Sequence, residues 1–353
     1  MATNLDRLRT VMVSAATKET AYDTAAAVDS RILVNAGVIP NDTVEFQNNQ
    51  DLIGGSEEAS NATVISQSMT MALAQNRVKP HTLAFVAAYA LGGATTATPS
   101  GGTTARKHTI TPAAAVAQNS FTMEAKNKTG VQNKWSGCMI DSFNLSFTRG
   151  SNRFCDLTAS VLGSGTLAAG TATSAEVSEG GLNAADAALW IDNTTYDGTL
   201  SAEDLDLSVN DLTSNPSAVG TDLIGFEWDF SNNIDTDFLY TIGSGDQFGV
   251  AERIARSQTV TITRLYQDDA QRTEQLADTD LAVQVKVKNA QIASESLYYG
   301  FHIVFPKTRI QAREVADQGG RLVETLNLDV LEDAELGSVV LEVFNTQDIT
   351  YGG

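Results

Sequence analysis

The sequence predicts a mainly β protein with few helices, built as two related β lobes that each carry a helix. Two observations predict this fold class. Short stretches of alternating apolar and polar residues, separated by Gly, Asn and Ser turns, recur along most of the 353 residues. Several of these stretches then return in the same order later in the chain, which indicates an internal duplication.

The strand-like alternation is clearest in several short segments. In each of them every second residue is apolar, as in a strand with one buried and one solvated face. The segments are residues 68–73, 143–147, 204–209, 259–263 and 283–288. The turn residues between such segments favour a packed β architecture.

Three helices are predicted among these strands. Residues 80–91 begin with Pro80, continue with an Ala- and Leu-rich body and end before Gly92, which gives a helix start and a helix stop. Residues 267–278 predict a second, more polar helix, and residues 182–189 predict a short third one.

Four sequence matches predict the duplication. They are IGGS at 53–56 with IGSG at 242–245, SQSMTM at 66–71 with SQTVTI at 257–262, WSGCMI at 135–140 with YYGFHI at 298–303, and LTASVL at 157–162 with LNLDVL at 326–331. A predicted helix follows the second match in both copies. The order favours two copies of one lobe over two unrelated β domains. The free strand edges of such lobes can pair with further copies until a ring closes.

Two stretches rich in Gly, Ala, Ser and Thr interrupt the strand pattern. Residues 92–106 contain Pro99 and end at the basic run that starts with Arg106, so we expect an exposed, mobile loop. The second stretch precedes the repeat, and we place a linker at residues 166–181. The first lobe, with an N-terminal arm, is then residues 1–165. The second lobe, with a C-terminal tail, is residues 182–353.

The chain is strongly acidic, with a formal net charge of −20. Such a surface repels nucleic acid and anionic lipid, which argues against a protein that grips DNA but not against one that DNA slides past. Cys138 and Cys155 are too few for a disulfide scaffold, so we expect two buried thiols. No apolar run is long enough to cross a bilayer, and residues 1–10 lack the apolar region of a signal peptide. We therefore expect assembly in a cytoplasm.

The sequence contains no motif for catalysis or for ligand binding. His81, His108 and His302 each lack a second histidine three or four residues away, so packing is expected rather than metal binding. The glycine pairs lack the Lys-Ser/Thr of a phosphate loop, and no Gly-x-Ser-x-Gly elbow occurs. Paired carboxylates are expected to be a solvated surface in so acidic a chain. We predict no enzyme, no cofactor and no metal.

Two regions of the chain carry a recognisable series of motifs. The first is the opening ATKETAYDTA at 16–25, and the second, at residues 120–162, combines a Phe-Thr-Met-Glu strand, an aromatic-x-Gly-Cys element and a Ser-Phe-Asn-Leu-Ser-Phe strand. These motifs resemble those of the tail tube proteins of long-tailed bacteriophages, in particular the larger siphophage-type family, whose start is Lys-Glu-Thr-x-Tyr-Gly-Thr, with Asp23 here in place of the usual Gly. The resemblance is closest over residues 15–165, and it implies that each lobe is a β-sandwich with a flanking helix.

The resemblance implies a structural virion protein in the phage tail. It implies stacked rings that form a hollow tube around the tape-measure protein and later around the passing genome, with the inner sheets joined into a ring-wide β-barrel. Two fused lobes imply a trimeric ring of six lobes, with a hexamer as the alternative. Tail terminator and baseplate or tip proteins are the implied partners at the two ends of the tube, and no membrane is implied.

Several residues are candidates for contacts between subunits or between rings. They lie in the loop and in the Ile-Gly turns of the repeat: Gly92, Thr95, Pro99, Arg106, Lys107, His108, Ile53, Gly54, Ile242 and Gly243. The chain ends, residues 1–16 and 347–353, are long enough to reach a neighbouring ring.

Two other kinds of protein remain open at this point. One is another self-assembling β-protein, such as a decoration, baseplate or surface-layer subunit. The other is a carbohydrate- or Ca²⁺-binding β-module that uses Trp190, Trp228, Tyr298 and Tyr299 as an exposed platform. Burial of these aromatic residues in a sheet would remove the second alternative.

Overall fold

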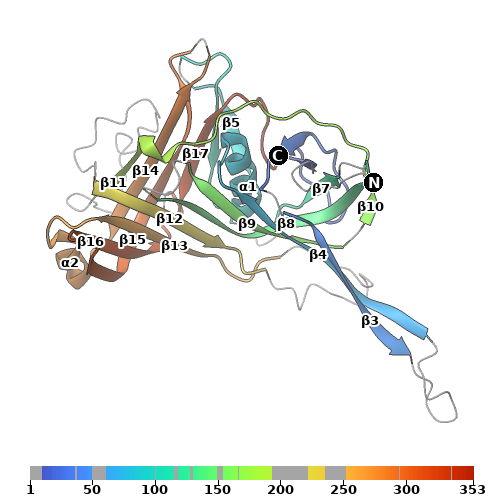
Figure 1. Cartoon of the computed structure of the whole chain (residues 1–353), viewed down its shortest axis with the longest axis horizontal. Coiled ribbons are helices and arrows are strands. Elements are labelled where there is room, and N and C mark those ends of the chain that lie inside the picture. Colours follow the sequence, from blue (N-terminus) through green and yellow to red (C-terminus); the bar gives the residue numbers. More distant parts are fainter. Residues whose placement is uncertain are drawn as a thin grey trace.

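The structure is a computed structural model, and it describes most of the chain. The described residues are 10–35, 38–49, 61–99, 101–114, 118–127, 130–148, 154–165, 167–192, 222–234, 252–293, 295–334 and 336–353. Within them the protein is mainly β, as predicted, and it has two α-helices, α1 (Pro80–Leu91) and α2 (Ala270–Ala277) (Figure 1). The predicted strand at 204–209 and the first pair of sequence matches, at 53–56 and 242–245, lie outside the described residues.

The strands divide into two sets along the chain. The first set, here called the first half, is β1 (Thr10–Val13), β2 (Ser30–Ile32), β3 (Asn41–Asn49), β4 (Asn61–Gln75), β5 (Ala94–Ala97), β6 (Arg106–Ile110), β7 (Phe121–Lys126), β8 (Gln132–Thr148), β9 (Asp156–Gly163) and β10 (Leu167–Ala169). The second half is β11 (Ala187–Asp192), β12 (Leu223–Ser231), β13 (Ser257–Leu265), β14 (Leu281–Gln291), β15 (Tyr298–Asp317), β16 (Leu322–Leu331) and β17 (Val340–Asn345).

One antiparallel sheet, here called the main sheet, runs through both halves. Its strand order is β3-β4-β9-β8-β12-β13-β16-β15. The junction of the two halves is the pairing of β8 with β12, in register from Ser142↔Ser231 to Thr148↔Gly225. The main sheet is therefore continuous across the middle of the molecule.

The two longest strands each leave the main sheet at a bulge. β8 has an irregularity between Ile140 and Ser142, and β15 has one between Ile310 and Ala312. The part of β8 before its bulge pairs with β7 and β10, and β7 pairs with β1. The part of β15 before its bulge pairs with β14 and β17, and β14 pairs with β11. Bulges bend a strand, so one chain segment can serve two layers.

The pairings of the first half recur in the second half. β3–β4, β4–β9, β9–β8, β8–β7, β8–β10 and β7–β1 correspond in order to β12–β13, β13–β16, β16–β15, β15–β14, β15–β17 and β14–β11. The helix follows β4 in one half and β13 in the other. The sequence matches at 66–71, 135–140 and 157–162 fall in β4, β8 and β9, and their counterparts in β13, β15 and β16. The domain boundaries themselves stay a prediction.

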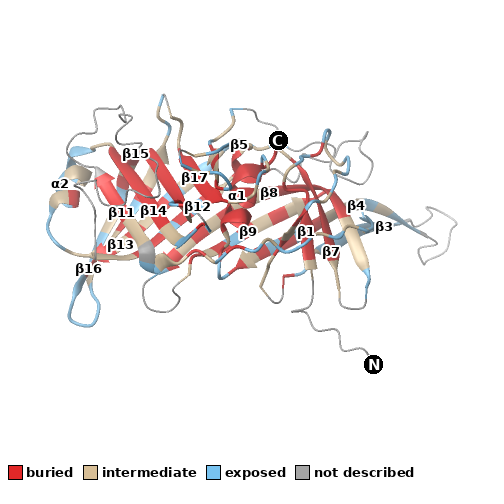
Figure 2. Ribbon diagram, turned by 90° about the horizontal axis from the view of Figure 1, so that it is seen from above, coloured by how far each residue is buried: buried red, intermediate tan, exposed pale blue. Residues whose placement is uncertain are grey.

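Helix α1 lies at the centre of the core. Pro80 occupies the first turn, and Gly92, with φ 130, ends the helix in a conformation that side chains disfavour. All residues of α1 are buried, and its neighbours are β8 and β6 of the first half and β15 and β17 of the second (Figure 2). An Ala- and Leu-rich helix fits this place because it has no polar face to solvate.

The other two predicted helices differ from the prediction. Helix α2 is shorter than residues 267–278: it begins only after its N-cap residue Asp269, and Asp278, with a left-handed φ of 53, ends it. The predicted helix at 182–189 is a 3₁₀ turn (Ala184–Asp186) that leads directly into β11. The pairing of β11 with β14 overrides the local helix preference there.

The loop at residues 92–106 is not the free segment that we expected. β5 and β6 form a hairpin, and β6 pairs with β17 of the second half. Glu295, on the β14–β15 turn, accepts hydrogen bonds from the backbone N–H and hydroxyl of Thr103 and Thr104. These bonds, led by those from Thr104, lower the pKa of Glu295 to about 2.

The C-terminal tail is also anchored. Tyr351 is fully buried, and its hydroxyl lies 2.7 Å from His81 Nδ1 and accepts a hydrogen bond of 3.0 Å from Asn345 Nδ2. Its backbone carbonyl accepts from Ala94 N–H at 3.0 Å. The tail of the second half therefore seals the core of the first half, and it does not extend outward as the sequence suggested.

The predicted linker is packed against the rest of the chain. Within residues 166–181, β10 pairs with β8, and the buried carboxylate of Glu179 accepts from His81 N–H at 3.0 Å. Burial raises the pKa of Glu179. Both cysteines are buried and unpaired, as predicted.

His302 is a buried polar residue whose ring makes no hydrogen bond among the described residues. It lies in β15 at 0% exposure. Burial, together with the nearby Lys286 and Lys107, holds the pKa of His302 well below 6.5. When residues 135–140 are aligned with residues 298–303, Met139 of the first half is the equivalent of His302. Met139 is fully buried too.

Replacing His302 by Met is expected to stabilise the protein. Removing an unsatisfied buried polar group contributes roughly 1–3 kcal/mol at neutral pH. Because the folded-state pKa is depressed, the unfolded chain takes up the proton first as the pH falls below 6.5, and the wild type then loses about 1.4 kcal/mol per pH unit. Denaturant unfolding at pH 7, 6 and 5 measures the free energy of unfolding of H302M and of the wild type, and the difference between them should grow as the pH falls. The matched control Met139→Leu should show an offset that does not change with pH.

Candidate assembly surfaces

The first candidate surface is one face of the main sheet, here called the polar face. Cross-strand partners point to the same side of a sheet, so one row runs from Thr158 through Asn144, Asp229 and Thr259 to Asp329. With the neighbouring rows, the polar face consists of Ser142, Asn144, Ser146, Asp156, Thr158, Ser160, Glu227, Asp229, Ser231, Ser257, Thr259, Thr261, Asn327 and Asp329. Each of these residues is half-buried or exposed.

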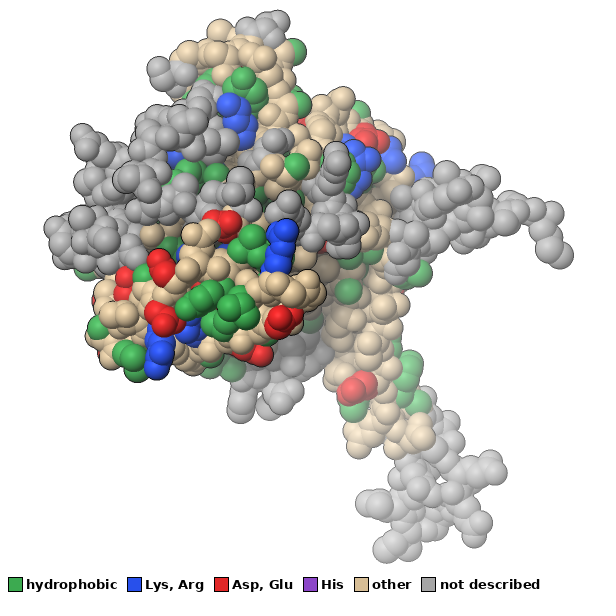
Figure 3. All heavy atoms as spheres, turned by 60° about the vertical axis from the view of Figure 1, so that its left-hand side comes forward, with side chains coloured by type: hydrophobic (Ala, Val, Ile, Leu, Met, Phe, Trp, Pro, Cys, Tyr) green, Lys and Arg blue, Asp and Glu red, His purple; other side chains and the backbone are tan. Residues whose placement is uncertain are grey.

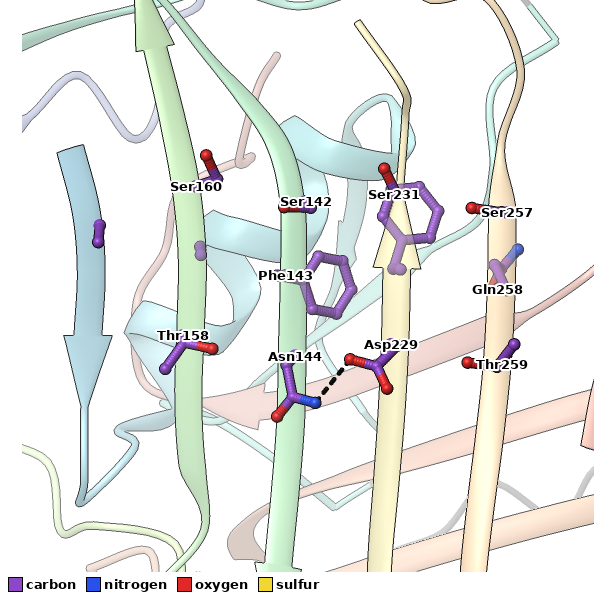
Figure 4. A pocket seen from close by; sticks show the side chains of 13 residues that line it. Ser142, Phe143, Asn144, Thr158, Ser160, Asp229, Ser231, Ser257, Gln258 and Thr259 are labelled. Atoms are coloured by element: carbon purple, nitrogen blue, oxygen red, sulfur yellow. Dashed lines mark hydrogen bonds between the residues drawn. The ribbon is translucent and has the colours of Figure 1, made fainter. Parts of the chain in front are cut away.

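The polar face is rich in hydroxyl, amide and carboxylate groups. The row that reaches Asp329 continues on β15 with Arg309, whose guanidinium is paired with Asp278 at 3.0 Å and with Asp280 at 2.5 Å. Asn144 Nδ2 donates to Glu227 Oε1 and to Asp229 Oδ1, both at 2.7 Å (Figure 4). A shallow hollow lies over Phe143 and its neighbours here.

The opposite face of the main sheet is apolar and closed. Phe226, Trp228 and Phe230 alternate with the acidic residues of β12 and are buried. The Trp228 ring packs edge-on against Phe143 of β8 at 4.8 Å and against Phe305 of β15 at 5.4 Å. The apolar face of the main sheet therefore packs towards the core, on the side where α1 lies (Figure 4).

The second candidate surface consists of the two free edges of the main sheet. β3 pairs only with β4, and β15 beyond its bulge pairs only with β16, among the described strands. Residues 41–48 of β3 are exposed, and so are most residues from 311 to 317. Unpaired strand edges are templates for another chain.

The hairpin of β3 and β4 extends one of these edges into an arm. The arm projects away from the body of the molecule (Figure 1). It carries apolar side chains that a free chain leaves in water: Val44 is 41% exposed, Phe46 61% and Ile65 48%. Such side chains together on one hairpin mark a contact surface.

The aromatic residues do not form an exposed platform. Trp190 and Trp228 are buried, at 2% and 0% exposure. Tyr298 is half-buried beneath Lys288, whose Nζ lies 3.8 Å from the ring centroid, and Tyr299 is half-buried beside Leu297. With both tryptophans buried and both tyrosines half-buried, these four residues do not supply the exposed platform that the carbohydrate-binding alternative needs. Among the described residues, no group of three or more His, Cys, Asp or Glu could hold a metal ion.

A comparison with protein-family models decides what these surfaces belong to. The model of the phage tail tube protein family matches residues 10–327.

The chain belongs to the phage tail tube protein family.

Tail tube proteins are structural components of the virion tail that assemble into a stacked tube, and this chain is one of them rather than an enzyme. A solved structure of the SPP1 tail tube is also similar to it. That structure is 12% identical, the match covers 46% of this chain and 77% of that chain, and the TM-score is 0.27. No curated protein matches the chain. None of the described helices has the length and apolar character needed to cross a bilayer.

The opening tail tube motif forms a buried clamp. The carboxylate of Glu19 accepts hydrogen bonds from Ser120 and Thr122 hydroxyls at 2.8 and 2.7 Å and from Gly137 N–H at 3.0 Å. Burial raises the pKa of Glu19. Asp23 has φ 61, which explains why glycine usually stands at this position. Here the Asp23 carboxylate is held by the Ser136 and Ser164 hydroxyls at 2.6 and 2.7 Å.

The predicted contact residues fall into two groups. Gly92, Thr95, Pro99, Arg106, Lys107 and His108 lie in or beside the β5–β6 hairpin. Three of them bind the end of the second half: Arg106 pairs with Asp348 at 2.7 Å, Lys107 with Glu342 at 2.9 Å and His108 with Asn345 at 2.8 Å. Ile53, Gly54, Ile242 and Gly243 lie outside the described residues. The role of both groups between subunits or rings stays a prediction.

Sequence reasoning did not identify the polar face or the edge of β15. The alternation of Phe226, Trp228 and Phe230 with Glu227 and Asp229 was a usable signal for a strand with one acidic and one apolar face. It does not say which strands are neighbours, because pairing between distant segments leaves no local pattern.

Proposed function

We propose that three copies of this tail tube protein close a ring of six lobes. The observation that carries the proposal is the β8–β12 junction. In the repeated order β15 corresponds to β8, and β3 corresponds to β12. The junction that β8 makes with β12 inside one chain is therefore a template for pairing β15 with β3 of the next chain. Eight strands from each of three chains then form a closed barrel of 24 strands, with no free edge.

The repeat supports two lobes close to residues 1–165 and 182–353, with β10 of the first half (Leu167–Ala169) lying beyond the first of these boundaries. Each lobe contributes four strands to the main sheet and one helix. The alternative is a hexameric ring. Electron microscopy of rings assembled from the purified 37.5 kDa chain, combined with their native mass, tests the count. Six lobes and a mass of three chains are expected; six chains per ring would contradict the trimer.

In this ring the polar face lines the bore. A barrel buries its apolar side against the outer layer and leaves the other side to the channel, so hydroxyls and carboxylates face the tape-measure protein and the passing DNA. Arg309, which lies on this face beside Asp329, is paired with Asp278 and Asp280, so DNA phosphates find little free counter-charge and slide through. The arm of β3 and β4 and the predicted contact residues are the parts offered to the next ring, and terminator and baseplate or tip proteins close the two ends.

A triple substitution of the polar face is expected to make the tube retain DNA. Glu227→Lys, Asp229→Lys and Asp329→Lys replace three negative charges in each chain by three positive ones. Wild-type tubes should not hold short duplex DNA, whereas tubes of the triple variant should hold it at about 50 mM salt and release most of it near 200 mM. Co-sedimentation measures the retained DNA.

Protection from a nuclease separates DNA inside the bore from DNA on the outer wall. The isosteric triple variant E227Q/D229N/D329N is the matched control and should retain far less DNA. Intact tubes of the Lys variant that hold no protected DNA would contradict the assignment of this face to the bore.

A further inference from the structure

The two helices of the repeat have different surroundings. Helix α1 is covered on its outward side by β15 and β17, which belong to the second half. Helix α2 contacts β15 on its inward side, where Gln271 is buried, and its outward residues Arg272, Thr273, Leu276 and Ala277 are exposed. Leu276 stands in the middle of this outward face with 77% exposure. Figure 3 brings this end of the molecule forward and shows apolar side chains among charged ones at the surface.

The repeat indicates what belongs on α2. β17 pairs with the early part of β15 as β10 pairs with the early part of β8. The strands that cover α1 thus correspond to β10 and β8 of a first half. For α2, that first half is the one in the next chain of the ring, the same neighbour whose β3 reaches the edge of β15.

The matching surface on β10 lacks a cover within one chain. Leu167 stands across from the buried Trp135, so it points to the core side of its layer, yet it is 54% exposed. The corresponding strand of the second half, β17, pairs with β15 a few residues further along and has such a cover: its Leu341 and Val343 are fully buried in the same cluster as α1. An apolar residue on the core side of a layer remains in water only until another element packs on it.

We propose that the outward face of α2 packs on β10 and the start of β8 of the neighbouring chain, with Leu276 seated against Leu167. This inference rests on the proposed ring and names an outer contact in addition to the strand pairing. The occupant is a second copy of this chain. Two apolar side chains that a single chain leaves exposed are buried together when the ring closes.

Thiol cross-linking tests the contact. The double variant L276C/L167C, treated with a short bis-maleimide after assembly, should give covalent dimers and trimers on a denaturing gel, with trimers as the limit. The single variants L276C and L167C should give neither, because Cys138 and Cys155 are buried. Before assembly the double variant should remain monomeric. T273C/A169C on the same two faces is a second pair in case the first disturbs assembly.

The outcomes separate this contact from the ring itself. Rings or tubes of the double variants that are seen by microscopy but yield no covalent trimers would overturn the α2 contact and leave the ring intact. Failure of the wild-type chain to form rings at all would overturn the proposed function. Leu276→Asp is expected to raise the protein concentration needed for assembly at least tenfold, whereas the matched control Leu276→Met should leave it unchanged. An unchanged value for L276D would also overturn the contact.

Discussion

A proline on the free edge of β15 is expected to abolish ring formation while the chain stays folded. Beyond the bulge, β15 pairs with β16 on one side and with no other described strand on the other. Successive backbone N–H groups of such a strand point alternately to the partner and to the open side. At the adjacent exposed positions Glu314 and Val315, one proline therefore removes a donor of the internal ladder, and the other removes only a donor that the next chain would use.

The two variants are told apart before assembly is measured. Whichever of Glu314→Pro and Val315→Pro keeps a thermal unfolding close to that of the wild type has lost only the outward donor, and it is the informative variant. It should remain monomeric by light scattering under conditions in which the wild type forms rings. The alanine variants Glu314→Ala and Val315→Ala keep the N–H groups and should assemble. Rings formed by the folded proline variant would refute closure through this edge.

Replacing Trp228 by Ala is expected to cause the largest loss of stability. The side chain is fully buried, and its ring contacts Phe143 of the first half and Phe305 of the second. Removing a buried Trp or Phe side chain typically costs about 3–5 kcal/mol, because the lost transfer free energy adds to the cost of the cavity. Denaturant unfolding followed by far-UV circular dichroism measures this loss.

The position of Trp228 gives the prediction a second readout. Because it lies behind the β8–β12 junction, W228A should also make this junction more accessible to hydrogen exchange than the pairing of β14 with β15. Trp228→Phe keeps an aromatic contact and should lose well under half as much stability. A W228A loss below about 1 kcal/mol would show that the two halves do not depend on this contact.

The sequence predicted the features that depend on local pattern. α1 has the bounds that Pro80 and Gly92 predict, and the matches at 66–71 and 257–262 lie in corresponding strands, β4 and β13. The composition also predicted a mainly β chain. These features are readable because proline, glycine and a period of two act on neighbouring residues.

The features that the sequence did not predict depend on distant partners. Residues 92–106 resemble a free loop until Glu295, about 190 residues further on, binds Thr103 and Thr104. The tail is anchored by His81, which lies 270 residues before Tyr351. Residues 182–189 form part of a strand because β14 offers an edge. None of these partners leaves a signal in the segment itself.

The β5–β6 hairpin and the anchored tail have a mechanical consequence for a tube of such rings. Both strengthen the contact between the two halves of one chain. β6 pairs with β17, Glu295 accepts hydrogen bonds from Thr103 and Thr104, and Tyr351 packs into the core of the first half beside His81. The second half has no such hairpin between α2 and β14, where only Asp278, Thr279 and Asp280 intervene. In the proposed ring of three chains, stiff and compliant seams would then alternate. A tail that flexes would yield along three lines parallel to its axis, and its cross-section would distort with threefold rather than sixfold character.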